Sequence, residues 1–277
     1  MKIKVLGSAA AECCPALWCE CEFCEKARKE GGKNLRRRTS YLIDDDTLID
    51  LGPDFFWQIH EFGIDDRKLK RIIFTHPHVD HLNPVEFLWR HSGFSKVTQE
   101  LHVLGAKSVM TRLLHFACFV GNAYSMEELH LKPILLAHGK YAEDGDIGIL
   151  PLKANHALGM NPYLYILSRG GRKLFICNDT GILPEESMKE LAGQQVDMMF
   201  IDSTAGFTEP DCINYHMGVN TVVKTRDKLL EIGALKKDAI VIANHFSHNG
   251  NPLHADLEAF FNPKGIQVAC DGMTLEL

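Results

Sequence analysis

Residues 75–81 constrain this chain more strongly than any other part of its sequence. They read Thr-His-Pro-His-Val-Asp-His and directly follow residues 71–74, which we expect to form a buried strand. Three imidazoles and one carboxylate this close together would leave unpaired donors or charge in a folded protein unless a partner bound them. A divalent metal ion binds such groups directly. The pattern H-x-H-x-D-H therefore predicts a metal site at the end of this strand.

The size and charge of the chain limit the classes of function. Its 277 residues are 45% hydrophobic and contain no Pro/Gly/Ser-rich linker, which predicts a single domain over residues 1–277. A net charge of −6 provides no electrostatic attraction for nucleic acid or an anionic membrane. The sequence has no apolar run of about 20 residues that would span a membrane. Residues 2–6 read as a first strand and not as a secretory signal, so we expect a cytoplasmic protein.

Short apolar or alternating segments predict strands, and helical patterns lie between them. The predicted strands are residues 2–6, 40–44, 47–50, 71–74, 100–104, 147–152, 163–168, 173–177, 197–201, 239–243, 266–269 and 273–276. The predicted helices are residues 54–62, 84–91, 106–120, 184–191, 217–232 and 252–261. Many strands with interleaved helices predict an α/β (α+β) protein of stacked sheets covered by helices. We expect a helical insertion at about 106–140, which would shape the pocket or contact a second copy in a homodimer.

Three further polar residues follow predicted strands downstream, namely His156, Asp179 and His245. Each alone would be an ordinary buried polar residue. In this order after H-x-H-x-D-H, however, they make the chain similar to the metallo-β-lactamase-fold hydrolases. That resemblance implies a four-layer αββα sandwich with the active site along one edge.

The resemblance also implies how the ligands divide between two metal ions. One ion would be held by His76, His78 and His156, the other by Asp80, His81 and His245, and Asp179 would bridge them. Two divalent ions exceed the charge of two carboxylates and one hydroxide, which favours an anionic substrate. Ions about 3.5–4 Å apart activate a water near neutral pH and clamp a phosphoryl group. These nitrogen and oxygen ligands fit Zn²⁺, Mn²⁺ or Fe²⁺, and the sequence does not choose among them.

A second cluster consists of Cys19, Cys21 and Cys24, within a segment at about 13–38 that we expect to be a zinc-binding loop. The odd number of cysteines, nine, and their tight spacing favour metal ligation over disulfides. Tetrahedral Zn²⁺ needs a fourth ligand, for which His248 is the candidate. Three thiolates and one imidazole leave the site negatively charged, so we expect a structural zinc. The remaining alternatives are Cys13, Cys14, or a reduced thiol cluster without metal.

Scattered motifs make the chain resemble the PhnP and PqqB branch of the fold. They are residues 7–10, Pro15, the C-x-C-x₂-C segment, residues 178–181, the H-x₂-H pair at 245–248, and residues 271–273. PhnP-type proteins are phosphodiesterases that open phosphoribosyl cyclic phosphates, whereas PqqB belongs to pyrroloquinoline quinone biosynthesis. PqqB-like proteins tend to lack a complete catalytic ligand set. All seven positions are filled in this chain, which favours the phosphodiesterase side.

His216 stands just before the predicted helix 217–232, where PhnP-like sequences carry a functional histidine. A non-ligand imidazole near the metals would act as the catalytic acid that protonates the leaving alkoxide, with Asp80 as the catalytic carboxylate. A helix N-terminus would lower the pKa of His216 and oppose this role. A helix-capping or packing role is the alternative.

The leading hypothesis is therefore a metal-dependent phosphodiesterase that cleaves a small or cyclic anionic phosphodiester. Its cofactors would be two divalent ions, Zn or Mn or Fe, and one structural Zn. The alternatives are a non-catalytic accessory or carrier protein of the PqqB kind, a thioester or lactone hydrolase, and a tRNA-processing nuclease. The nuclease would need a basic arm, which the sequence does not contain, so nucleic acid is not an expected partner.

Overall fold

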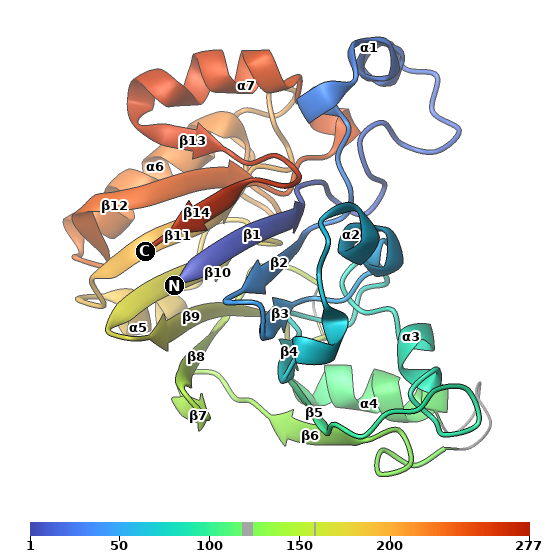
Figure 1. Ribbon diagram of the computed structural model, residues 1–277. Coiled ribbons are helices and arrows are strands. Elements are labelled where there is room, and N and C mark those ends of the chain that lie inside the picture. The colour runs from blue at the N-terminus through green and yellow to red at the C-terminus, as the bar shows by residue number, and fades with distance from the viewer. Residues whose placement is uncertain (118–123, 158) are drawn as a thin grey trace.

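Two seven-stranded sheets face each other in the computed structural model, which describes residues 1–117, 124–157 and 159–277 (Figure 1). The first sheet contains, in spatial order, β14 (Thr274–Glu276), β1 (Lys2–Gly7), β2 (Ser40–Ile43), β3 (Thr47–Ile49), β4 (Arg71–Ile73), β5 (Leu101–Gly105) and β6 (Leu131–Leu135). The second contains β13 (Ile266–Val268), β12 (Leu235–Asn244), β11 (Val196–Asp202), β10 (Arg172–Cys177), β9 (Tyr163–Arg169), β8 (Ile147–Lys153) and β7 (Ala142–Asp144).

Helices cover the outer face of each sheet, which gives four layers (Figure 1). The first sheet is covered by α2 (Phe55–Glu61), α3 (Val85–Leu88) and α4 (Lys107–His115), and the second by α5 (Glu185–Leu191), α6 (Val219–Glu231) and α7 (His254–Phe261). One apolar cluster, which includes Ile73 and Phe200, fills the space between the sheets. Two more clusters lie under the helices, around Phe74 and around Phe261. This αββα sandwich confirms the predicted fold.

Strand direction brings the ends of several strands to the same edge. β3 to β6 pair in parallel in the first sheet, and β10 to β13 pair in parallel in the second. The carboxyl ends of parallel strands meet at one edge, so the loops that follow β4, β10 and β12 lie close together. This edge carries the histidines and aspartates predicted from the sequence.

The helical insertion predicted for 106–140 is wrong in part, because this segment contains strand β6 after helix α4. β6 reads Leu-Lys-Pro-Ile-Leu and pairs in parallel with β5 at the border of the first sheet. Its proline and lysine interrupt the apolar pattern, and a border strand tolerates proline because one side needs no ladder hydrogen bonds. The predicted helix 106–120 ends at His115, and residues 118–123 lie outside the described residues.

The predicted zinc loop contains a helix that the sequence patterns do not indicate, α1 (Glu22–Glu30). It begins at Cys21, whose Sγ accepts a hydrogen bond from the backbone N–H of Cys24. Cysteine is not among the residues that usually cap helices, so capping rules give no signal there. Two of the three predicted zinc ligands, the capping residue Cys21 and Cys24 in the first turn, are therefore positioned by helix α1.

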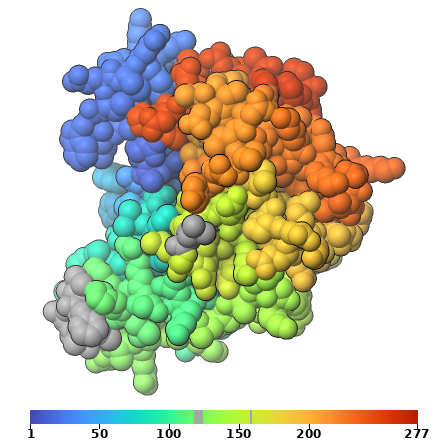
Figure 2. Space-filling model, turned by 180° about the vertical axis from the view of Figure 1, so that it is seen from behind, coloured from blue at the N-terminus to red at the C-terminus, as the bar shows by residue number. Residues whose placement is uncertain are grey.

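The N-terminal segment is tied to the C-terminal half of the chain, as Figure 2 shows by the contact of its blue and red-orange segments. The buried Arg36 donates hydrogen bonds to Ser8 Oγ (2.9 Å) and Ala269 O (2.6 Å) and packs over Phe246. Its other amino group lies 2.9 Å from His254 Nδ1. Burial and this guanidinium lower the pKa of His254 to about 4, so the imidazole is neutral at pH 7.

Within the described residues, no helix is long and apolar enough to cross a membrane.

Candidate metal centres

The structure brings together all seven residues predicted to hold two metals. They lie in the loops after β4, β8, β10 and β12, and their ligand atoms form overlapping groups within 4.8 Å of one another. We call this set the dimetal centre; its members are His76, His78, Asp80, His81, His156, Asp179 and His245. Most of them are buried, with exposed fractions of 6% or less for Asp80, His81, Asp179 and His245.

Three imidazoles form the first half of the dimetal centre. Nδ1 of His78 lies 2.8 Å from Nε2 of His76 and 3.3 Å from Nε2 of His156. Burial and the charge of His81 lower the pKa of His76 well below its usual value, so this ring is neutral. Neutral imidazoles with converging nitrogens are the form that binds a metal ion.

Two histidines and two carboxylates form the second half. Oδ2 of Asp179 lies 2.9 Å from Nε2 of both His81 and His245, while its Oδ1 lies 3.6 Å from Nε2 of His156. Asp80 Oδ2 lies 3.1 Å from His81 Nε2. The oxygens of Asp179 thus face both halves, as a bridging ligand would. Burial favours the neutral acid, but the charges of His245 and His81 still hold the pKa of Asp179 well below its usual value.

Three buried atoms among the described residues, His81 Nε2, His245 Nε2 and Asp179 Oδ2, make no hydrogen bond of regular geometry, although Asp179 Oδ2 lies 2.9 Å from each of the two nitrogens. Buried polar atoms without a partner are rare in native proteins and need an explanation. All three point into the same small space, and their chemistry is that of Zn²⁺, Mn²⁺ or Fe²⁺ ligands. The residues present therefore fit a metal pair.

Polar residues behind the dimetal centre orient the rings through their outer nitrogens. Nδ1 of His81 lies 2.7 Å from Asp50 Oδ2, and Nδ1 of His245 lies 2.8 Å from Thr204 Oγ1. Such partners fix the tautomer and the orientation of a metal-binding imidazole. Asp50 is a residue of this site that none of the sequence motifs predicts. Its position at the carboxyl end of β3, at the same edge, was the available signal.

The backbone is strained at two members of the centre, because Asp179 and His245 have φ angles of 51° and 61°. The left-handed region costs a non-glycine residue of order 1–3 kcal/mol, and such strain concentrates at functional sites. Asp50 behind the centre has a φ angle of 60°. The surrounding structure therefore holds these carboxylates and this imidazole in positions that a relaxed chain would not favour.

His216 is not one of the seven predicted ligands, but its ring lies beside the dimetal centre, with a nitrogen within 4.8 Å of ligand atoms of Asp179, Asp202 and His245. Its ring centroid is 5.0 Å from that of His156 and 5.9 Å from that of His245. Its Nδ1 is 3.0 Å from Asp202 Oδ2. Burial opposes the charged form, but the carboxylate of Asp202 raises the pKa of His216 to about 9. This pKa is raised and not lowered as expected for a helix N-terminus, because the carboxylate of Asp202 lies 3.0 Å from the ring whereas α6 begins only at Val219.

The loop that carries His216 rests directly on the loop that carries Asp179. The backbone N–H of Ile182 donates to Ile213 O at 2.9 Å. A Cβ atom at Gly181 would come within 2.1 Å of the same carbonyl oxygen. Glycine at position 181 therefore lets the two loops meet, which places His216 over the metal ligands.

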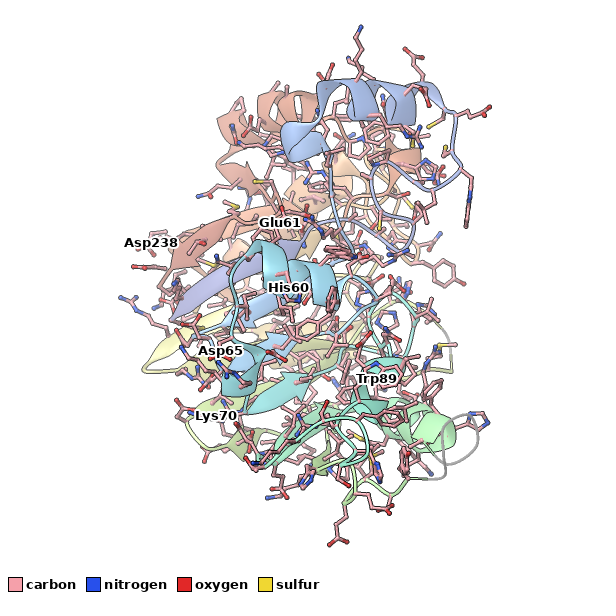
Figure 3. The ribbon with its side chains drawn as sticks, turned by 45° about the vertical axis from the view of Figure 1, so that its right-hand side comes forward. His60, Glu61, Asp65, Lys70, Trp89 and Asp238 are labelled. Atoms are coloured by element: carbon pink, nitrogen blue, oxygen red, sulfur yellow. The ribbon has the colours of Figure 1, made fainter. Side chains whose placement is uncertain are left out.

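A pocket of about 590 Å³ opens onto the dimetal centre and His216. Its wall includes His78, Asp80 and two carboxylates, Glu12 and Glu209, and it contains neither lysine nor arginine. A second pocket of about 580 Å³ lies between α2 and the segment after α3, where Figure 3 labels His60 and Trp89. It contains none of the predicted site residues. The pocket at the dimetal centre is therefore the candidate substrate site.

The three predicted cysteines form a second site with His248, which we call the cysteine site. Their Sγ atoms lie 3.6, 3.8 and 3.6 Å from His248 Nδ1 for Cys19, Cys21 and Cys24. Zn–S bonds of about 2.3 Å and Zn–N bonds of about 2.0–2.1 Å in a tetrahedron separate sulfur and nitrogen by about 3.6 Å. The four residues therefore fit one zinc ion. The alternative ligands lie elsewhere, with Cys13 3.7 Å from Asp54 and Cys14 3.5 Å from Phe246 O.

The thiols of the cysteine site differ in acidity. Burial opposes ionisation, but hydrogen bonds from His248 and from the backbone of Cys24 lower the pKa of Cys21 to about 6. Burial raises the pKa of Cys24 to about 12. The thiolate form is therefore favoured at Cys21 and opposed at Cys24. Nε2 of His248 faces Glu12, whose Oε1 is 3.7 Å away and which also lines the substrate pocket.

Comparison with known proteins agrees with this fold. The model of the β-lactamase superfamily domain matches residues 46–245. A diphosphatase of the PhnP family has a similar structure, with 23% identity, a TM-score of 0.73, and coverage of 100% of this chain and 96% of that one. Zn²⁺-bound PqqB from Methylobacterium extorquens has 18% identity and a TM-score of 0.76, with both chains covered completely. The short form of human tRNase Z has 14% identity, a TM-score of 0.66, and coverage of 100% and 99%. Among curated proteins, no sequence matches.

Proposed function

This chain belongs to the β-lactamase superfamily, and we propose that it is a phosphodiesterase that hydrolyses a small or cyclic phosphodiester at the dimetal centre. The observation that carries the proposal is the convergence of the buried ligand atoms of His81, His245 and Asp179, in which Asp179 Oδ2 lies 2.9 Å from each imidazole nitrogen without a regular hydrogen bond, beside a pocket that Asp179 and His245 line. A purely structural polar cluster would have satisfied these atoms with hydrogen bonds.

Each half of the dimetal centre has a separate role in this proposal. His76, His78 and His156 would hold one ion, and Asp80, His81 and His245 the other, with Asp179 between them. Two bound divalent ions would supply an activated water and neutralise the charge of the phosphate. Asp50 and Thr204 keep His81 and His245 oriented, so the ligand geometry exists before the substrate arrives.

His216 is the proposed acid for the leaving group. Asp202 holds a proton on this imidazole at neutral pH, and the ring lines the same pocket as His78 and Asp80. An alkoxide leaving group needs a proton in the transition state, and a positioned acid contributes about 10²–10⁴-fold to the rate. This pairing favours esters of alcohols over substrates whose leaving group is already stable as an anion.

The similar diphosphatase broadens the substrates that a test should include. A diphosphate and a phosphodiester are both attacked at phosphorus, and the same ligand arrangement serves either reaction. A thioester or lactone is attacked at carbon and gains less from a cationic clamp on phosphoryl oxygens. Relative rates on these three classes therefore distinguish the proposal from its alternatives.

The test is hydrolysis of bis(p-nitrophenyl) phosphate by protein whose metal content has been measured by elemental analysis. We expect turnover with two divalent ions per chain at the dimetal centre, and slower or no cleavage of a thioester and a lactone. Reconstitution with Zn²⁺, Mn²⁺ or Fe²⁺ would identify the active metal. No turnover of any phosphodiester or diphosphate with both ions bound would contradict the proposal. A carrier protein would instead show zinc at the cysteine site alone.

A further inference from the structure

An asparagine directly precedes each of the ligands Asp179 and His245, and both asparagines bind the same tyrosine. The Nδ2 groups of Asn178 and Asn244 each donate a hydrogen bond to Oη of Tyr41, both at 2.5 Å. All three side chains are buried, with exposed fractions of 3% or less. We call these three residues the Tyr41 bridge. Since a hydroxyl oxygen has two lone pairs, the two amides use its full capacity to accept hydrogen bonds.

The Tyr41 bridge connects two strands that are not neighbours. Asn178 directly follows β10 and Asn244 ends β12, while β11 lies between these strands. Tyr41 belongs to β2 in the other sheet, and its ring packs against Phe200 of β11 with 4.6 Å between the ring centroids. The hydroxyl therefore lies between the two sheets and joins the ends of β10 and β12, which share no ladder of hydrogen bonds.

No other contact in the described part of the chain replaces this connection. Oη of Tyr41 is the only hydrogen-bond partner of either asparagine side chain there, and Oδ1 of both asparagines is buried without a partner. Burial raises the pKa of Tyr41 well above its usual value, so the phenol is neutral. Loss of the hydroxyl would leave two buried amide donors without an acceptor, which is unfavourable in a folded protein.

The two ligands beside the bridge depend on support from their surroundings. The backbone of Asp179 and of His245 lies in the left-handed region, which persists in residues other than glycine only where the surrounding structure enforces it. Asp179 Oδ2 and His245 Nε2 must also stay close, since they lie 2.9 Å apart in the second half of the dimetal centre. Fixing the residue before each ligand limits both the backbone conformation and this separation.

We propose that the hydroxyl of Tyr41 is a positioning group of the dimetal centre, which sets the spacing of Asp179 and His245 by holding the residues that precede them. This inference rests on the proposed function, because it assumes that these two side chains bind metal ions. Tyr41 does not line the substrate pocket, so it acts through the ligands and not on the substrate. Loss of a group that orients metal ligands typically weakens metal binding about 10–100-fold.

The variant Tyr41→Phe tests this role, because it removes the hydroxyl and keeps the ring against Phe200. Titration with Mn²⁺, followed by electron paramagnetic resonance, reports on the dimetal centre, since Mn²⁺ suits oxygen ligands whereas thiolates select Zn²⁺. We expect the variant to bind the Mn²⁺ pair at least about tenfold more weakly than the wild type, with an altered signal from the coupled ions. Zinc retained at the cysteine site, measured by elemental analysis, shows that the variant is folded. An unchanged Mn²⁺ affinity would overturn the inference.

Two further variants assign the effect to the bridge. Tyr163→Phe is the matched control, because Tyr163 lies in the same apolar cluster and its hydroxyl makes no hydrogen bond among the described residues. It should bind Mn²⁺ as the wild type does. Asn244→Ala removes one of the two contacts, so Tyr41→Phe should cost less Mn²⁺ affinity in that background than in the wild type. Fully additive losses would indicate general destabilisation and contradict the proposal. If Tyr41→Phe also loses its zinc and unfolds, the Mn²⁺ titration of Asn244→Ala decides.

Turnover separates a positioning role from a catalytic one, and this inference from the proposed function. At limiting metal, Tyr41→Phe should hydrolyse bis(p-nitrophenyl) phosphate about tenfold more slowly than the wild type. At saturating metal, kcat should return to within about twofold with KM unchanged, because the hydroxyl does not touch the substrate. A deficit in kcat that excess metal does not restore would contradict positioning through the ligands. Absence of hydrolysis in the wild type would count against the phosphodiesterase and leave the Mn²⁺ titration to decide the role of Tyr41. A wild type that binds no pair of ions would overturn both.

Discussion

The dimetal centre and the cysteine site use opposite arrangements of ligands. The dimetal centre takes nitrogen and oxygen atoms from the loops after four different strands, and it opens onto a pocket of about 590 Å³. The cysteine site takes three sulfurs from one short segment and closes with a single imidazole. Two divalent ions bound at the former would exceed the charge of its two carboxylates, whereas three thiolates would exceed the charge of one zinc ion at the latter. Residual positive charge and an open position suit catalysis, while a closed, negative site suits structure.

The two sites nevertheless share one loop. His245 belongs to the dimetal centre and His248, three residues later, to the cysteine site. Glu12 lies between them, since it faces His248 Nε2 and also lines the substrate pocket. A substitution at one site is therefore expected to affect the other, and variants of each site measure how far the two differ in their effects on activity and stability.

The largest effect on activity should follow from His78→Ala. Loss of one imidazole from the first half of the dimetal centre removes a metal ligand, and a bound metal ion contributes several kcal/mol to the transition state. We expect kcat/KM on bis(p-nitrophenyl) phosphate to fall by roughly a thousandfold or more. The melting temperature should change little, because the apolar layers hold the scaffold. The control His60→Ala changes a histidine on α2 and should retain activity.

The next effect concerns stability and should follow from Cys21→Ser. The binding energy of a structural zinc is also folding energy, so this variant should release zinc and lower the melting temperature by about 10 °C. Elemental analysis and calorimetry measure both quantities. The control Cys212→Ser changes a thiol outside the cysteine site and should keep the zinc. An unchanged zinc content in Cys21→Ser would show that the site is a reduced thiol cluster.

A smaller and substrate-dependent effect is expected for His216→Ala. If this imidazole protonates the leaving group, turnover of alkyl diesters should fall by about a hundredfold. Turnover of bis(p-nitrophenyl) phosphate should fall much less, because p-nitrophenolate leaves without a proton. The dependence of log kcat on the pKa of the leaving group measures the difference. An equal loss for both substrate types would assign His216 a packing role beside His156 and His245.

The features that sequence predicted well are those carried by local motifs or by the order of residues that matches a known family. The histidines and aspartate of 76–81 converge with the later His156, Asp179 and His245, as the resemblance implies, and the three cysteines converge with His248, as their spacing and the need for a fourth zinc ligand predicted. Their function as metal ligands remains a prediction. The apolar patterns also predicted most strands of the two sheets and most of the helices that cover them. The reason is that the spacing of apolar residues along a strand or helix depends directly on which of its faces are buried.

What sequence missed depends on contacts between distant segments. The pKa of His216 follows from Asp202 at the end of β11, fourteen residues earlier, and not from the adjacent helix. The orientation of His81 depends on Asp50, thirty-one residues earlier in the chain. Strand β6 was hidden because Pro133 and Lys132 break its apolar pattern, and only its pairing with β5 makes it a strand. None of these relations has a signature within a short window of residues.

The smallest expected effect, Glu12→Gln, tests whether the two sites are coupled. Glu12 faces the outer nitrogen of His248 and accepts hydrogen bonds from Ser247 Oγ and from Asn249 Nδ2, the latter at 3.4 Å. A carboxylate behind a zinc-binding imidazole raises its basicity, and its loss typically weakens zinc binding about tenfold or more. We therefore expect the zinc affinity of Glu12→Gln, measured by chelator competition, to be about one tenth of the wild-type value. Phosphodiester turnover should change less. The exposed Glu20 on the same segment provides the control Glu20→Gln, which should match the wild type in both assays. A change in turnover with unaltered zinc affinity would place Glu12 in the substrate pocket alone and leave the cysteine site energetically separate from the dimetal centre.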